Sequence, residues 1–299
     1  MLGLTTSMKE VAYLSLNDPG QISSILRKVL NTHGYGFQYA VMRRGEELYS
    51  SRRSRWVFDV AEFPVVGDQT IHIDFLLKSQ SGRTIVVAEC KRADPAKALW
   101  CFARSPYNWR NSDVEEVSFE HLEYKLGVSI NRLPHFAVST KKTYDLGFDL
   151  RTGEKGDGFG NNIAAINSAV TQVLRGTSGL INHIHHGVMN SIGASGAFIF
   201  IPAIFTTAQI WLTDADLGAA DPATGDLDVA AIEAKQTDWI WFTHNRSPSL
   251  KPNIDIVKPN NLFGDLSFDI RQEFARSIAI ISVNGIDNFL SADLENWLW

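Results

Sequence analysis

The sequence has few cysteines and no long, uninterrupted apolar run. Only Cys90 and Cys101 occur in 299 residues, so a disulfide framework is excluded and a reducing, cytoplasmic setting is expected. The start of the chain lacks the basic and apolar regions of a signal peptide. The longest apolar stretch, 196–212, contains Pro202 and is rich in β-branched and aromatic residues, which predicts a buried strand and not a membrane span. No membrane partner is therefore expected.

An excess of positive charge is also lacking. The chain has 28 Lys and Arg against 33 Asp and Glu, a net charge of −5, which excludes a protein that coats nucleic acid indiscriminately. The two halves differ, however. Residues 1–150 carry 19 basic and 17 acidic side chains, whereas residues 151–299 carry 9 and 16. A polyanionic partner is therefore expected to bind the first half.

Apolar residues make up 44% of the chain and charged residues 20%, as in ordinary globular proteins. Capping and periodicity predict helices over 19–31 and about 37–48. Three largely apolar segments with short turns then predict an antiparallel meander of strands over 55–66, 70–77 and 83–91.

Further elements are expected after the meander. Asp94-Pro95 is typical of a helix start, which predicts a helix over about 95–104, and a fourth strand is expected over 134–140. A glycine-rich link over 153–160 precedes an amphipathic helix that begins near Ile163. Later elements are strand-like runs over 197–213, 228–233, 238–243 and 276–283, and a final helix over 284–298. This order predicts an α/β fold with a mixed sheet flanked by helices.

Charged residues stand at the ends of two strands of the meander. Asp74 lies within an apolar strand, and Glu89 and Lys91 close the next one. The intervening turn is short enough to bring Asp74 beside Glu89, and alternation puts Glu89 and Lys91 on one face while Cys90 faces the opposite layer. Two adjacent carboxylates and a backbone carbonyl, such as that of Cys90, are suitable oxygen ligands for Mg²⁺ or Mn²⁺. Lys91 is placed to hold a water or to neutralise charge on a phosphate.

This pattern resembles the PD-(D/E)XK nuclease superfamily, which has the restriction-endonuclease-like fold. Ile73-Asp74 matches the P-D pair with isoleucine in place of proline, and Glu89-Cys90-Lys91 matches E-x-K. Gln38 takes the place of an acidic residue that some members carry on the first helix, so one charged ligand is missing. The resemblance covers residues 20–142.

The resemblance implies a fold, a metal and a reaction. Asp74 and Glu89, with the Cys90 carbonyl, would bind Mg²⁺ or Mn²⁺, Lys91 would position the attacking water, and Gln38 would assist. The reaction would be phosphodiester hydrolysis, in DNA rather than RNA, as in a bacterial defence or restriction-type effector. The alternative is an inactive module of the same fold that binds nucleic acid or a protein.

An arginine-rich segment lies between the second helix and the meander. We interpret it as a phosphate-contacting surface, although a solvated helix end is the competing interpretation. The candidate nucleic-acid-binding residues are Arg43, Arg44, Arg52, Arg53 and Arg55, with Arg92 after the E-x-K motif.

The second half of the chain offers no comparable motif. Glu233-Ala234-Lys235 repeats E-x-K, but Asp228 lies too close to it in sequence for two strands and a turn, so an exposed strand is expected there. The predicted organisation is a nuclease-like core over 1–150 and an α+β region over 151–299. That region is either an extension of the core or a domain for a regulatory partner, and a homodimer is a further alternative.

Overall fold

A computed structural model describes residues 19–32, 34–65, 71–93, 98–106, 115–125, 129–151, 164–189, 196–228, 232–245 and 274–298. The chain divides into two compact units, Met1–Gly36 and Phe37–Trp299. The first contains α1 (Pro19–Thr32), which confirms the helix predicted over 19–31. The second contains the sheets described below.

The helix and the meander predicted before the E-x-K motif are confirmed. Their bounds are α2 (Tyr35–Ser50), β1 (Trp56–Val65), β2 (Ile71–Ser79) and β3 (Thr84–Lys91). β1 pairs antiparallel with β2, and β2 pairs antiparallel with β3. The β2–β3 turn closes when Gly82 donates its N–H to the Ser79 carbonyl at 2.8 Å, and Gly82 has a φ of 73°, which glycine adopts without strain.

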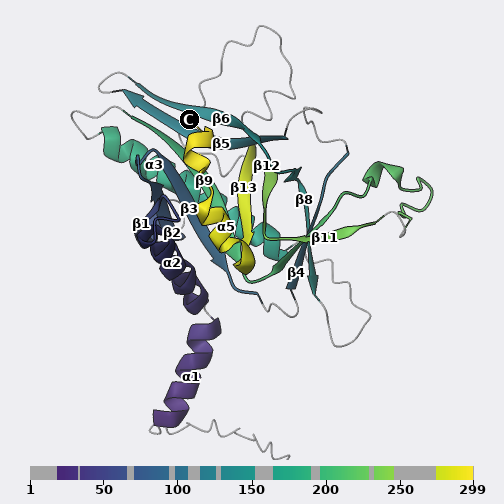
Figure 1. The fold of residues 1–299 in the computed structure, drawn as a ribbon, viewed down its shortest axis with the longest axis horizontal. Helices are drawn as coiled ribbons and strands as arrows, with labels where there is room; N and C mark the ends of the chain where they lie inside the picture. The colour runs from purple at the N-terminus through teal and green to yellow at the C-terminus, as the bar shows by residue number, and fades with distance from the viewer. Residues whose placement is uncertain are drawn as a thin grey trace, which may run out of the picture. The chain divides into compact units, whose positions relative to one another are not determined.

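The meander is one side of a large mixed sheet (Figure 1). The strands run in the order β1-β2-β3-β9-β13-β12-β7, and β9 also pairs with the β5–β6 hairpin. The added strands are β5 (Glu115–Lys125), β6 (Ser129–Ser139), β7 (Thr143–Tyr144), β9 (Gly196–Thr206), β12 (Trp239–Asn245) and β13 (Ala275–Ser282). β3, β9 and β13 are mutually parallel, so their carboxyl ends share one edge of the sheet. Both halves of the chain thus contribute strands to one sheet.

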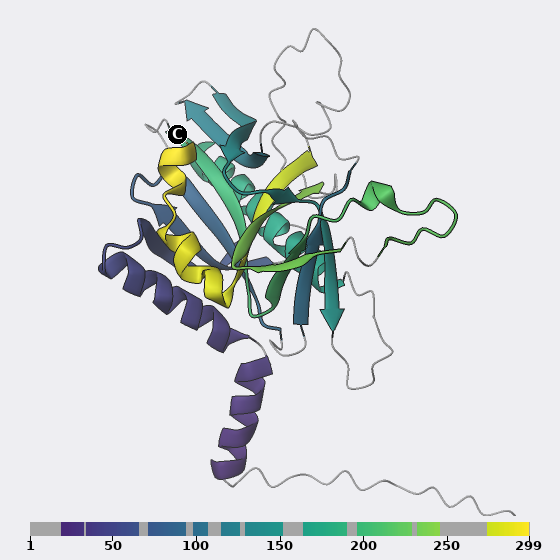
Figure 2. The same ribbon diagram turned by 45° about the vertical axis from the view of Figure 1, so that its right-hand side comes forward.

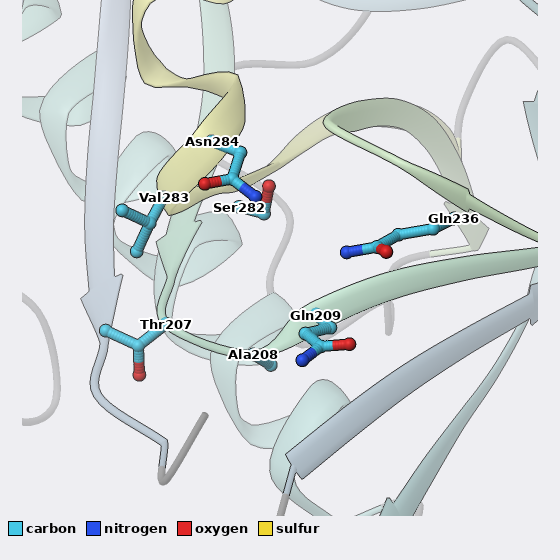
Figure 3. A pocket seen from close by; sticks show the side chains of 7 residues that line it. All are labelled: Thr207, Ala208, Gln209, Gln236, Ser282, Val283 and Asn284. Atoms are coloured by element: carbon cyan, nitrogen blue, oxygen red, sulfur yellow. The ribbon is translucent and has the colours of Figure 1, made fainter. Parts of the chain in front are cut away.

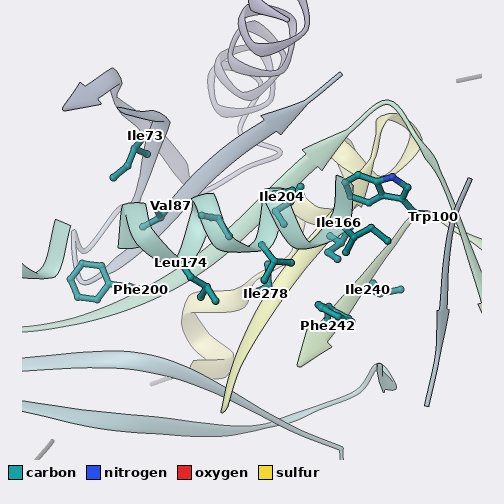
Figure 4. Packing of buried hydrophobic residues seen from close by; sticks show 14 of the residues in the cluster. Ile73, Val87, Trp100, Ile166, Leu174, Phe200, Ile204, Ile240, Phe242 and Ile278 are labelled. Carbon is teal, nitrogen blue, oxygen red and sulfur yellow. The ribbon is translucent and has the colours of Figure 1, made fainter. Parts of the chain in front are cut away.

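Helices cover both faces of this sheet (Figures 1 and 2). α3 (Ala164–Met189) packs on one face, and α2, α5 (Ile286–Ser291) and α6 (Leu294–Leu298) pack on the other. Strand alternation divides the core accordingly: Val87 and Ile204 face α3, whereas Val86 and Phe205 face the opposite helices. Figure 4 shows Ile166 and Leu174 of α3 against the first of these layers. None of the helices in the described ranges is long and apolar enough to cross a membrane.

A smaller, four-stranded sheet lies beside the large one. Its order is β11-β10-β4-β8, with bounds Ala234–Thr237, Gln209–Thr213, Ala98–Ala103 and Leu146–Arg151. Trp100 and Phe102 of β4 and Ile210 of β10 are buried in the same cluster as α3. The two sheets therefore share one hydrophobic layer.

Of two sequence predictions just after the meander, the helix is wrong and the strand is confirmed within a longer element. The predicted helix over 95–104 is strand β4 where it is described, because Ala98, Trp100 and Phe102 are buried with the two-residue period of a strand. The fourth strand, expected over 134–140, exists as part of β6 but forms a hairpin with β5. The strand that pairs with β3 is instead β9, which α3 precedes in the chain.

The remaining predictions differ mainly in their boundaries. The run over 197–213 is broken into β9 and β10 by a corner at Thr207 and Ala208. The described part of 228–233 is not strand, and β11 begins at Ala234. The strands predicted over 238–243 and 276–283 are confirmed as β12 and β13. The segment 284–298 is helical but interrupted, and the glycine-rich link lies outside the described residues.

Candidate active site

Asp74 and Glu89 lie where two neighbouring strands separate. The last register pair of the β2–β3 ladder at this end is Phe75 with Ala88, so Asp74 and Glu89 are the next residue on each strand. Oδ2 of Asp74 accepts the Cys90 N–H at 2.6 Å, which fixes the carboxylate across the gap between the strands. The sequence expectation that a short hairpin brings the two acids together agrees with this register.

Lys91 is held on the α3 side of the sheet by two partners. Its Nζ lies 2.7 Å from Oε1 of Glu89, and it also donates to the side-chain oxygen of Gln172 on α3. The Lys91 side chain is 28% exposed and that of Glu89 is 10% exposed, so the ammonium reaches solvent while the carboxylate is largely buried. The Cys90 side chain packs against the cluster on the opposite face, as alternation predicts.

Gln38 connects α2 to the same site. Its Nε2 donates to the Asp74 carbonyl oxygen at 2.9 Å and to Oε1 of Glu62 on β1 at 2.7 Å. Glu62 has a φ of 49°, the left-handed region that non-glycine residues adopt only at a cost in free energy. The backbone of β1 is therefore distorted at the residue whose carboxylate lies beside Asp74.

The site holds more negative than positive charge. Burial, together with the nearby Glu89 and Glu62 carboxylates, raises the pKa of Asp74 to about 7 against the opposing effects of the Cys90 N–H and Lys91. Burial also raises the pKa of Glu89, although Lys91 opposes that shift. Three carboxyl groups thus face one ammonium group. Binding of a cation would stabilise buried, uncompensated carboxylates of this kind.

The donor set fits a hard divalent cation such as Mg²⁺. Asp74 and Glu89 present carboxylate oxygens, and Mg²⁺ is usually bound in proteins by one or two carboxylates together with waters and substrate phosphates. Within the described ranges, no three or more His, Cys, Asp and Glu side chains form a metal-binding group. A two-carboxylate Mg²⁺ site is consistent with that finding, because water and phosphate supply its remaining ligands.

Two residues of this site, Glu62 and Gln172, were not identified from the sequence. Glu62 stands in an apolar strand, but Asp59 stands in the same strand, and only the register with β2 distinguishes them. Gln172 lies 81 residues from Lys91, and no local pattern marks it. Its approach depends on Gly176, one helical turn away, because a Cβ there would lie 2.9 Å from the Ile73 side chain. A glycine was needed for α3 to pack this closely on β2.

Three arginines of the predicted phosphate-contacting surface lie apart from the carboxylates. Arg52, Arg53 and Arg55 precede Trp56, which pairs with Ser79 at the far end of the β1–β2 hairpin. Five residues separate Ser79 from Asp74, a distance of about 17 Å along a strand. The structure therefore does not bring these three arginines to the site.

Acidic residues near the C-terminus pair with most of this arginine cluster. Arg44 binds both carboxylate oxygens of Asp287, and Arg53 lies 3.5 Å from Asp287. Arg55 lies 3.3 Å from Asp293. Arg43, whose side chain is 77% exposed, and Arg52 are exposed near α2, and Arg92 is exposed beside Lys91. The paired arginines thus attach α2 and the start of β1 to the C-terminal helices.

The second E-x-K sequence is exposed, as expected. Glu233, Ala234 and Lys235 are all solvent-exposed at the start of β11. They lack the buried strands that surround Glu89.

Comparisons with known proteins add no relative: no family model matches the chain, and neither a curated protein nor a solved structure matches it. Function must therefore be inferred from the site.

Proposed function

We propose that this protein is a divalent-metal-dependent nuclease that hydrolyses phosphodiester bonds in DNA. The observation that carries the proposal is the Asp74, Glu89 and Lys91 group at the separating ends of β2 and β3, where carboxylates outnumber cations. A nuclease site needs this combination, because it must bind a cation and then accept a polyanionic substrate.

The order of elements supports the same proposal. A helix, α2, precedes the antiparallel β1-β2-β3 meander, and a second helix, α3, precedes β9, which is parallel to β3. This is the order that the PD-(D/E)XK resemblance implies for a restriction-endonuclease-like core. On this proposal, the segment that carries β4 to β8 would be an insertion into the core, which would explain why the motif alone did not locate α3 and β9.

The residues divide the chemistry between them. Asp74 and Glu89 would hold the metal with the Cys90 carbonyl, and the metal when bound would supply Lewis acidity and favour ionisation of a water. Lys91, fixed by Glu89 and Gln172, would hold the attacking water and stabilise negative charge on the phosphate. Water adds to phosphorus, the bond to the leaving oxygen breaks, and a proton ends on that oxygen. Gln38 and Glu62 would position the Asp74 backbone.

The test is a cleavage assay on plasmid, linear duplex and single-stranded DNA and on RNA, with Mg²⁺ or Mn²⁺. Lys91→Ala and Glu89→Gln should each lower the cleavage rate by about 10²- to 10⁴-fold, the usual contribution of a group that acts on proton transfer. The matched controls are Lys142→Ala and Glu233→Gln, because both residues are exposed and lie on other segments. Full activity in both site variants would contradict the proposal. Binding of DNA in EDTA without cleavage under any condition would favour the inactive module.

A further inference from the structure

A cavity of about 280 Å³ lies between the large and the small sheet (Figure 3). It is formed at the corner between β9 and β10, at the end of β13 and on β11. Its lining residues are Thr207, Ala208, Gln209, Gln236, Ser282, Val283 and Asn284. All lie in the unit that also contains the candidate active site.

The lining is neutral and rich in side-chain amides. The amides of Gln236 and Asn284 face the open space in Figure 3, and neither has a hydrogen-bond partner among the described residues. The hydroxyl groups are already used, since Thr207 Oγ1 accepts the Ala93 N–H at 2.7 Å and Ser282 Oγ donates to the Asp238 carbonyl at 2.8 Å. The groups left for a ligand are therefore planar amides, each with a donor and an acceptor side by side.

This chemistry matches the edge of a nucleobase. Asparagine and glutamine form paired hydrogen bonds with base edges, most typically with adenine, and discriminate between bases by this geometry. A phosphate or a carboxylate would find no cation, because the lining contains no charged side chain. Ala208 and the half-exposed Val283 supply apolar surface for the face of a ring. The volume is just below the usual range of about 300–1,000 Å³ for ligand pockets, so it suits a base better than a larger group.

The cavity also lies close to the proposed cleavage site. Lys91, Thr206 and Ser282 are register partners at the carboxyl ends of the parallel strands β3, β9 and β13. The N–H of Thr207, which lines the cavity, donates to the Lys91 carbonyl at 3.2 Å. Two strand spacings separate Lys91 from Ser282, about 10 Å in all. Nucleotides are spaced about 3.4 Å apart along one strand of a duplex, so this distance corresponds to about three nucleotides.

We infer that this cavity receives one nucleobase of the DNA, turned out of the base stack, and that Gln236 and Asn284 read its edge. The inference rests on the proposed nuclease function, because the scissile phosphate at Lys91 brings the base to the cavity. It adds a base preference within about three nucleotides of the cut.

The first measurement uses cleavage specificity. Wild type, Gln236→Leu and Asn284→Ala are incubated with Mg²⁺ and a duplex library of random sequence, and the cut ends are sequenced. Wild type should prefer one base at a single position near the cut, and each variant should weaken that preference about tenfold or more, the cost of one paired base contact. Asn245→Ala is the control, because Asn245 is exposed and lies at the end of β12 that is away from the cavity. The other end of β12, at Trp239, pairs with Ile281, the residue before Ser282 of the cavity lining.

The second measurement does not depend on cleavage. Oligonucleotides that carry the adenine analogue 2-aminopurine at successive positions are bound to the protein in EDTA. Fluorescence should rise at one position, where the base leaves the stack, and this rise should be lost in Gln236→Leu and Asn284→Ala but kept in Asn245→Ala.

The outcomes separate the two proposals. Cleavage by wild type with no base preference, or with one that both variants retain, overturns the pocket assignment and leaves the nuclease proposal intact. If wild type does not cleave, the nuclease proposal fails and fluorescence decides the pocket. A position-specific rise that depends on Gln236 and Asn284 then supports a base-binding cavity, and its absence overturns it.

Discussion

Two groups of buried charge occupy the large sheet, and they are built in opposite ways. Glu120 on β5 is bound by Arg132, with N–O distances of 2.8 and 3.0 Å, and Arg276 lies 2.9 Å from it. These three residues are at most 3% exposed. The two guanidinium groups oppose the effect of burial and hold the pKa of Glu120 below its usual range. Cations therefore outnumber the anion in this group.

The candidate active site has the reverse balance. Carboxylates outnumber the single Lys91 ammonium, and the pKa values of Asp74 and Glu89 are raised. The difference indicates what each group does. The Glu120 carboxylate is bound by a guanidinium group and has a second one close by, as a buried carboxylate that serves the fold needs, whereas the Asp74 and Glu89 carboxylates outnumber their cation and are suited to binding another.

The largest expected effect on stability is that of replacing Glu120, the carboxylate that the two arginines surround. Glu120→Gln leaves two buried guanidinium groups without their carboxylate and should lower the free energy of unfolding by roughly 3–5 kcal/mol. Glu123→Gln, a substitution of a 40% exposed side chain on the same strand, should change it by less than about 1 kcal/mol. Urea unfolding measures both. If Glu120→Gln fails to fold, Arg132→Leu provides the test, because it leaves Glu120 paired with Arg276 and should still fold.

Glu89→Gln is the matched substitution at the active site, and it should not lower stability. It removes one of three mutually repelling carboxyl groups. A loss as large as that of Glu120→Gln would contradict the contrast between the two groups.

The next largest effect is a dependence of stability on pH. The pKa of Asp74 is about 7 in the folded protein and near 3.8 when unfolded, so the folded state binds more protons between these values. In EDTA, this residue's contribution should be fully present below pH 4 and lost as the pH rises to 7, by about 4 kcal/mol at most. Asp74→Asn should reduce this slope, leaving the part that the raised pKa of Glu89 contributes, and make the protein more stable than wild type at pH 8. Parallel unfolding curves for the two proteins across this range would contradict the prediction.

Metal binding should recover the stability that is lost at high pH. At pH 8, Mg²⁺ or Mn²⁺ at 100 times its Kd should stabilise wild type by about 2.7 kcal/mol, because it binds the folded state alone. Thermal unfolding with and without the metal measures this. Asp74→Asn and Glu89→Gln should lose most of the effect, whereas Glu123→Gln should retain it. An equal response in all four proteins would mean that the metal binds elsewhere.

The smallest effect concerns the arginines near α2. Arg44→Ala breaks the partly exposed contact with Asp287 and should lower stability only slightly, whereas Arg43→Ala should have almost no effect. Arg43 and Arg52 remain predicted phosphate contacts. Replacing either arginine by alanine should reduce the slope of log Kd against log salt concentration for DNA binding by about one. An unchanged slope in both variants would remove them from the DNA-binding surface.

The sequence by itself determined the parts of the molecule that depend on neighbours in the chain. The α2 helix, the β1–β3 meander and the Asp74, Glu89 and Lys91 motif follow from local periodicity and from a short turn. A hairpin restricts its own register, so the residues that face each other across it can be read from sequence.

Only the tertiary structure decided which distant segments complete the sheet and the site. β9 rather than β6 is the neighbour of β3, although about 100 residues lie between β3 and β9 in the chain, because strand pairing depends on buried surface that local patterns do not encode. Glu62 and Gln172 joined the site through a strand register and a close helix contact at Gly176. The cavity of Gln236 and Asn284 likewise exists because the ends of β9 and β13 lie beside β11 of the smaller sheet, which no single segment specifies.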